Sequence, residues 1–220
     1  YQRNEGQVSP RIGVSYKYNP SNVFHVFYGR MFTPPNLEAI SFAKLNTLGT
    51  RAQPEDLTNN TVRAERAHYF EVGSYHALNR YATLQFTGWY KLSNFLSDAG
   101  QFGTTPLLNY FAFERGWQRG IDGALKLQLT ENLTARGNVA WGQCKGYGLQ
   151  SGHFLLEAKE IADINSQGGG FCDHMQTLTS SAIVSYRLLE RTTFTGQMLF
   201  ASGLRTSENE DAKTNSSHSP

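Results

Sequence analysis

The segment Ile121–Trp141 reads IDGALKLQLTENLTARGNVAW. Its two halves alternate, with apolar or small residues at every second position and mostly polar or charged residues between them. The apolar positions are Ile121, Gly123, Leu125, Leu127, Leu129 and then Leu133, Ala135, Gly137, Val139, Trp141. Because side chains of a strand point to opposite faces in turn, this pattern predicts two strands, each with one apolar face. The short segment Thr130–Leu133 between them predicts a tight turn.

The same alternation occurs on both sides of this segment. It predicts six further strands, at about residues 9–18, 23–32, 67–77, 81–91, 177–187 and 193–200. In the last five of the eight strands, no apolar lane contains a charged residue.

The connections between the predicted strands alternate in length. Short turns are expected near Asn19–Asn22, Leu78–Arg80, Thr130–Leu133 and Leu189–Arg191. Long loops are expected at Thr33–Glu65, Asp98–Pro106 and Gly146–Phe171, the first with a short helix at 37–48. A barrel in a bilayer has two such unlike rims.

Alternation alone is also compatible with a soluble β-sandwich, in which the polar lane faces water. Predicted strands of about ten residues favour a barrel, because that length crosses hydrocarbon at a strong tilt. Aromatic residues gather at the strand ends, as in the two interfacial girdles of membrane barrels. They are Tyr18, Tyr75, Tyr81 and Tyr186 near the short turns, and Trp89, Tyr90 and Trp141 towards the long loops. The sequence thus predicts an all-β fold, an antiparallel up-and-down transmembrane β-barrel segment of about eight strands.

Composition excludes several other classes of protein. Only 39% of the residues are apolar, and no apolar run approaches the roughly 20 residues of a membrane helix. The net charge of +2 and the scattered basic residues argue against a nucleic-acid partner. No nucleophile elbow, phosphate loop or dinucleotide fingerprint occurs, so we expect a protein that is not an enzyme and has no cofactor.

The two cysteines flank the third long loop. If the strands before Cys144 and after Cys172 pair antiparallel, the two sulfurs lie within bridging reach at the base of the loop. A disulfide is the favoured interpretation, over free thiols and over a metal site, for which Cys172 and His174 alone supply too few ligands.

Residues 155–164, inside that loop, have the spacing of a short amphipathic helix. Leu155, Leu156, Ile161 and Ile164 would share one face, and Glu157, Glu160 and Asp163 another. The acidic residues and the nearby His153 are candidates for ligand contact, but a simple solvated helix face explains them as well.

The polar lanes of the last four predicted strands hold four charged residues that would line the interior of a barrel, namely Asp122, Lys126, Arg136 and Arg187. Asp122, Lys126 and Arg136 are expected to form ion pairs there rather than an acid–base site.

Several segments, in order, resemble the barrel of TonB-dependent outer-membrane receptors. They are SPRIGVSY at 9–16, FYGRMFTPPNL at 27–37, ERAHYFEVG at 65–73, DHMQTL at 173–178 and ASGLRT at 201–206. The resemblance implies short turns in the periplasm, long loops outside the cell and a location in the bacterial outer membrane. It implies energy-coupled uptake of a scarce large nutrient, such as a ferric siderophore, with the long loops contacting a ligand that the sequence does not identify.

The resemblance extends over nearly the whole chain but leaves out parts of the family pattern. A plug domain, the box that engages the TonB energy-coupling protein, and a final aromatic-ended strand are not found. Residues 1–220 are therefore expected to be part of a 22-stranded barrel domain, with 201–220 as a polar loop. Its partners would be outer-membrane lipid, the plug and TonB. The alternatives are a complete eight-stranded barrel with a structural or adhesive role, in which the first and last strands pair, and a soluble carbohydrate-binding sandwich.

Overall fold

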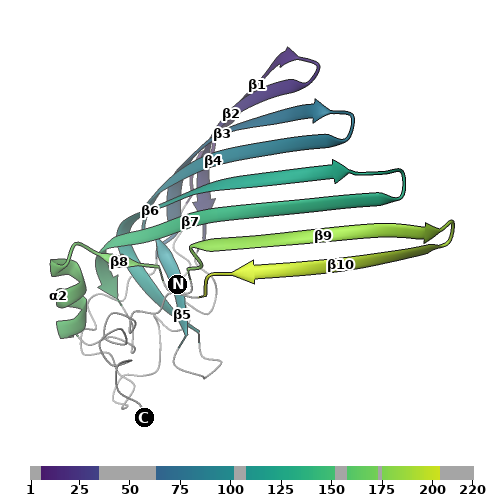
Figure 1. Cartoon of the computed structure of the whole chain (residues 1–220). Helices are drawn as coiled ribbons and strands as arrows, with labels where there is room; N and C mark the ends of the chain where they lie inside the picture. Colours follow the sequence, from purple (N-terminus) through teal and green to yellow (C-terminus); the bar gives the residue numbers. More distant parts are fainter. Residues whose placement is uncertain (1–5, 35–62, 102–107, 152–157, 173–174, 204–220) are drawn as a thin grey trace, which may run out of the picture.

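The computed structural model describes residues 6–34, 63–101, 108–151, 158–172 and 175–203. These residues form one antiparallel sheet whose main path contains eight strands, in the order β1-β2-β3-β4-β6-β7-β9-β10 (Figure 1). The path follows the chain, so the topology is up-and-down, as the sequence predicted. The short strands β5 and β8 pair with β6 and β7, outside this path.

The main strands differ in length. Their bounds are β1 Arg11–Asn19, β2 Asn22–Thr33, β3 Glu65–Asn79, β4 Ala82–Asn94, β6 Leu108–Gln128, β7 Leu133–Ser151, β9 Leu178–Leu189 and β10 Thr192–Ala201. The remaining elements are β5 Ser97–Gln101, α2 Ala158–Ser166 and β8 Gly170–Phe171. In Figure 1 the four hairpin turns lie together at one end of the sheet, while β5, β8 and α2 lie at the other. We call these the short-turn end and the long-loop end.

Side chains of the turn residues close several of the hairpins. The side-chain oxygen of Asn19 accepts hydrogen bonds from the backbone N–H of Ser21 and from Asn22. Asn79 accepts one from the backbone N–H of Tyr81, 2.7 Å away. Asn side chains commonly stabilise turns in this way, which explains why these positions gave clear turn signals in the sequence.

The cross-strand register sorts the side chains of the main strands onto two faces. One row across the sheet consists of Val14, Val26, Val72, Gly88, Ile121, Trp141 and Leu178. This apolar face is exposed: Val72 is 60% accessible, Ile121 58% and Met198 64%. The opposite, polar face carries the lanes of Glu71, Trp89 and Asp122.

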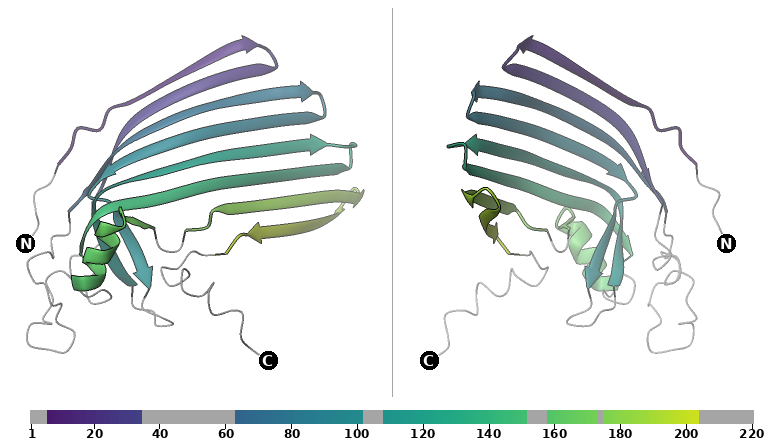
Figure 2. Two further views of the ribbon diagram at one scale, coloured as in Figure 1. Left: turned by 60° about the vertical axis from the view of Figure 1, so that its left-hand side comes forward. Right: turned by 90° about the vertical axis from the view of Figure 1, so that its right-hand side faces the viewer.

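The exposed apolar face contradicts the soluble sandwich, which would have to bury it under a second layer. The closed eight-stranded barrel also fails, because β1 and β10 lie at opposite ends of the strand order in the part of the chain that the structure describes (Figure 2). The sheet is an open segment of a barrel wall.

The long-loop end differs from the sequence prediction. Residues 146–151, expected in a loop, continue β7, and Leu108–Gly120 lengthen β6 well beyond its alternating core. The expected loop at Asp98–Pro106 begins with β5, whereas strand β9 starts at Leu178, within one residue of its predicted start. The physical reason is that these strand ends are polar or aromatic on both faces, so no apolar period marks them. The helix expected at 37–48 lies outside the described residues.

Among the described residues, no helix is long and apolar enough to cross a membrane.

Candidate functional site on the polar face

The polar face carries a connected set of side chains from four neighbouring strands, which we call the polar network: His25, Tyr69, Glu71, Trp89 and Asp122. Glu71 on β3 is central. One of its carboxylate oxygens lies 3.2 Å from Nε2 of His25 on β2. The other accepts a hydrogen bond of 2.7 Å from the Tyr69 hydroxyl.

Aromatic rings carry the polar network onward to β6. The ring of Tyr69 stacks on that of Trp89 on β4, with 6.4 Å between centroids and 22° between planes. The indole N–H of Trp89 then donates a hydrogen bond of 2.8 Å to Asp122 on β6. The carboxylates of Glu71 and Asp122 therefore each accept a hydrogen bond from a defined donor. The stacked rings of Tyr69 and Trp89 lie between them, so the acid and aromatic groups form one ordered surface.

Two glycines make room for these rings against the sheet. A Cβ placed on Gly120 would lie 2.5 Å from the Trp89 ring and 2.8 Å from the Trp141 carbonyl oxygen. A Cβ on Gly73 would lie 2.6 Å from Nε2 of His25 and 2.9 Å from a backbone oxygen. Only glycine allows the rings to lie this close to the backbone, so the sequence of β3 and β6 shapes the site as much as its polar residues do.

A second acid lies nearer the long-loop end of the same face. Glu65 is buried and forms an ion pair with Lys91, with 2.8 Å between the charged atoms. The same carboxylate accepts a hydrogen bond of 2.5 Å from the Ser93 hydroxyl. A buried carboxylate needs such partners to remain charged, and both come from β4, which pairs with β3.

The four charged residues expected in the interior occupy the polar lanes of β6, β7 and β9, as their register shows. They do not form the expected ion pairs in the described part of the chain: Asp122 pairs with Trp89, and Lys126 lies directly opposite Arg136. Arg187 instead donates hydrogen bonds to the side chain of Asn132 in the short turn before β7.

Sequence reasoning missed His25, Tyr69, Glu71 and Trp89 as site residues. Tyr69 and Glu71 are two residues apart in β3, and Trp89 is the register partner of Glu71 in β4. The same alternation that revealed Asp122 would have found them, had the polar lanes of β3 and β4 been compared. Trp89 and Tyr75, assigned to interfacial girdles, lie in these polar lanes instead.

At the long-loop end, Cys144 and Cys172 are joined by a disulfide, with their Cα atoms 5.4 Å apart. The bridge belongs to a small buried cluster with Leu96, Phe113 and Leu149. Helix α2 packs on this cluster through Ile161 and Ile164, the apolar face that the sequence predicted. That the two cysteines are oxidised in the cell stays a prediction.

The side chain of Asn165 fastens α2 to β7. It accepts a hydrogen bond of 2.7 Å from the backbone N–H of Leu149 and donates one of 2.9 Å to the same residue's carbonyl. The candidate ligand residues Glu160 and Asp163 are exposed on this helix, whereas His153 and Glu157 lie outside the described residues. No group of three or more His, Cys, Asp or Glu in the described part of the chain is arranged to hold a metal ion.

Comparison with known families identifies this architecture. A family model described as "TonB dependent receptor-like, beta-barrel" matches residues 1–209. The chain belongs to this family. Members of the family of TonB-dependent receptors are proteins of the bacterial outer membrane. By sequence, no curated protein matches the chain.

Solved receptor and transporter structures share the fold of this TonB-dependent receptor segment. The FrpB iron transporter from Neisseria meningitidis (F3-3 variant) matches with a TM-score of 0.53 and 15% identity, over 86% of this chain and 26% of its own. The copper transporter OprC matches with a TM-score of 0.56 and 10% identity, over 88% of this chain and 26% of its own. A mutant of the ferric enterobactin receptor PfeA from Pseudomonas aeruginosa matches with a TM-score of 0.56 and 13% identity, over 88% of this chain and 27% of its own. The chain thus spans about a quarter of these proteins.

Proposed function

We propose that this chain is part of the barrel wall of an outer-membrane receptor that imports a scarce, metal-containing nutrient such as a ferric siderophore, driven by TonB. The observation that carries the proposal is the contrast between the two faces of one open sheet. An exposed apolar face is suited to lipid, and a polar face with fixed acid and aromatic groups is suited to a lumen.

Two further observations support this function. The family model covers nearly the whole chain, and its members are receptors and transporters rather than enzymes. The three structurally similar proteins are named for iron, copper and ferric enterobactin, all metals or metal complexes. In the proposal, the polar network faces the plug domain or the passing nutrient, and α2 with its loop contacts ligand at the outer rim.

The test is uptake by cells that express the full-length protein. A deletion strain grown with limiting iron is supplied with a panel of radiolabelled ferric siderophores, one at a time. We expect the deletion to abolish accumulation of one of them, and expression of the full-length protein to restore it. Dissipating the proton gradient should stop the restored uptake. Uptake that continues without the gradient would rule out energy coupling.

A variant then asks whether the polar face takes part. Glu71→Gln keeps the size of the side chain but removes the charge that His25 and Tyr69 contact. We expect uptake to fall about threefold to tenfold at an unchanged surface level of the protein, corresponding to roughly 1 kcal/mol for a hydrogen-bonded charge. The matched control is Val72→Ile, the next residue, whose side chain lies on the apolar face. Equal uptake in both variants would remove the polar network from the proposed pathway.

A further inference from the structure

Basic residues on the apolar face are confined to its long-loop end. Five of them lie there, which we call the basic band: Arg30, Arg66, Arg115, Arg119 and Lys145. A row of aromatic residues, Tyr28, Phe70 and Tyr90, pairs across β2, β3 and β4, and Arg119 on β6 continues this row as the register partner of Tyr90. From the short-turn end upward, this face is therefore apolar, then aromatic with Arg119 at the same level, and then basic.

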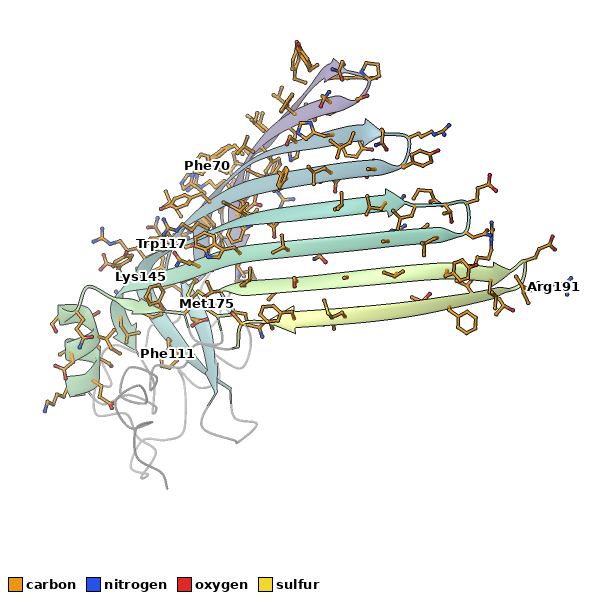
Figure 3. The ribbon with its side chains drawn as sticks, in the orientation of Figure 1. Phe70, Phe111, Trp117, Lys145, Met175 and Arg191 are labelled. Atoms are coloured by element: carbon orange, nitrogen blue, oxygen red, sulfur yellow. A yellow bond between two sulfur atoms is a disulfide. The ribbon has the colours of Figure 1, made fainter. Side chains whose placement is uncertain are left out.

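The centre of the basic band is the indole of Trp117. Lys145 is its register partner on β7, and Arg115 and Arg119 are two residues away on either side in the same lane of β6. Register partners lie about 5 Å apart and lane neighbours about 7 Å apart. Three long cationic side chains can thus converge on a single anionic group. Figure 3 shows Trp117 and Lys145 together at this end of the sheet.

Ring contacts hold these cations in place. The Arg119 guanidinium lies 4.7 Å from the Trp117 ring centroid, and two of its nitrogens donate hydrogen bonds to the Gln143 side chain. The Lys145 ammonium lies 5.2 Å from the Tyr147 ring, and the Trp117 N–H donates to the Tyr147 hydroxyl at 2.9 Å. Aromatic faces orient a cation but leave most of its hydrogen-bond donors available.

In the described part of the chain, no carboxylate forms an ion pair with the cations at the centre of the basic band. Within the described residues, the carboxylates of Glu71 and Glu65 contact His25 and Lys91, and no such contact involves Arg115, Arg119 or Lys145. Glu114, adjacent in sequence, has its carboxylate against Gly148 and makes no ion pair in that part of the chain.

Two hollows on the apolar face adjoin these cations. One of about 420 Å³ is lined by residues that include His68, Leu92, Arg115, Trp117 and Tyr147. The other, of about 790 Å³, is lined by residues that include Tyr28, Phe70, Tyr90, Arg119, Ile121 and Trp141. Arg115 borders the first and Arg119 the second, so that apolar space adjoins positive charge on one continuous surface.

We propose that this surface is a binding site for a phosphorylated lipid of the outer leaflet. Arg115, Arg119 and Lys145 bind the lipid phosphate, and the acyl chains lie along the aromatic row and the larger hollow. The site rests on the proposed orientation, in which the long loops face outward and the apolar face meets lipid. Basic groups level with an aromatic belt or just beyond it lie at the depth of the headgroups, where they attract anionic lipids.

The chemistry distinguishes a lipid from a dissolved anion. A free phosphate would need only the cations, which lie on an open, wet rim where screening weakens them. A lipid also covers the exposed aromatic and apolar surface below them. Arginines supply paired N–H donors that fit phosphate oxygens.

The test is native mass spectrometry of the full-length protein released from nanodiscs of phosphatidylcholine with a small fraction of bisphosphorylated lipid A. We expect one retained lipid A. Replacing Arg115, Arg119 and Lys145 together by Gln should weaken binding roughly 100-fold, from about fivefold per cation near a charged surface. The matched control replaces the polar-face cations Lys17, Lys126 and Arg136 by Gln, which should leave binding unchanged.

Three results would overturn the site: equal binding by dephosphorylated lipid A, equal loss in the control variant, or full displacement by millimolar inorganic phosphate. A further measurement needs no variant. The preference of the wild-type protein for lipid A over phosphatidylcholine should fall as the NaCl concentration rises from 50 to 500 mM. The heat-sensitive gel mobility of a folded barrel separates the two proposals. A folded, inserted protein without phosphate preference refutes only the lipid site, whereas a protein that never inserts refutes the proposed function.

Discussion

In the middle of the sheet one face is apolar from β1 to β10, whereas at the long-loop end the same face carries Arg115, Arg119 and Lys145. The polar face changes as well: the polar network is made of rings and acids, but the cluster around Cys144 is apolar and buried. The two ends of one strand thus meet different surroundings. β6 is apolar outside and polar inside along its alternating half, and the reverse holds near its start.

This difference shows what sets the sequence pattern of a barrel wall. Where lipid covers one face, every second residue must be apolar, because a charge there costs several kcal/mol. Above the headgroups both faces meet water or loops, and the requirement disappears. Strand pairing nevertheless continues, held by backbone hydrogen bonds, by the disulfide and by α2.

The largest effect is expected from separating the long-loop end from the rest. Replacing Cys144 and Cys172 by Ser should remove about 3.5 kcal/mol of local stability, from the loop-closure entropy of cysteines 28 residues apart. Hydrogen exchange in the full-length protein should then quicken at residues 143–151 and in α2, while residues 133–141 keep their protection.

Mass spectrometry of the unreduced wild-type protein provides the control. Treatment with an alkylating reagent should add no mass at either cysteine before reduction, and one label at each cysteine afterwards. Two labels without reduction would mean that the cysteines are free thiols. The Ser replacements would then give no reason to expect faster hydrogen exchange.

The second prediction places the same charge on both parts of the apolar face. Ile121→Arg should destabilise the inserted protein by about 2 kcal/mol, because in the proposed orientation Ile121 lies on the hydrocarbon side of the aromatic row. Leu92→Arg, beyond the aromatic row and beside the basic band, should cost less than about 1 kcal/mol. Both side chains are exposed, Ile121 at 58% and Leu92 at 45%, so packing does not distinguish them.

Urea unfolding of the full-length protein in vesicles measures both free energies. Similar losses for the two variants would show that the lipid boundary does not lie between Ile121 and Leu92. The proposed depth of the basic band would then be wrong as well.

The sequence was informative where lipid imposes a period and silent elsewhere. The eight strands, their short turns and the apolar lane through Ile121 and Leu125 follow from alternation alone. The extension of β7 through Tyr147 did not, because its residues are aromatic, polar or glycine on both faces.

The candidate site was predicted only in part for a similar reason. Asp122 was found because a charge in an alternating strand is easily noticed. Its partner Trp89 was assigned to an interfacial girdle because it is aromatic and near a strand end, although its place in the polar lane of β4 indicated the opposite face. The pairing of Tyr69 with Glu71 depends on rotamers, and the position of Gly120 under an indole depends on tertiary contact. Neither is encoded in a local pattern.

The smallest effect is expected from a variant in the middle of the sheet, on its polar face. Gly120→Ala should cost about 1–3 kcal/mol, since its methyl group would meet the Trp89 ring at 2.5 Å and the Trp141 carbonyl at 2.8 Å. The matched control is Gly142→Ala, directly opposite on β7, where a Cβ would meet only ordinary contacts of 3.5 and 4.0 Å. It should be neutral in urea unfolding.

A companion variant separates ring packing from hydrogen bonding. Trp89→Phe leaves an aromatic ring against Gly120 but removes the N–H that reaches Asp122, and it should cost about 1–2 kcal/mol. If Gly120→Ala and Trp89→Phe act through the same contact, the double variant should lose less than the sum of the two single losses. Strict additivity would mean that the Trp89 ring does not rest on Gly120. The polar network would then lack the fixed ring that joins Glu71 to Asp122, and the two acids would act as separate sites.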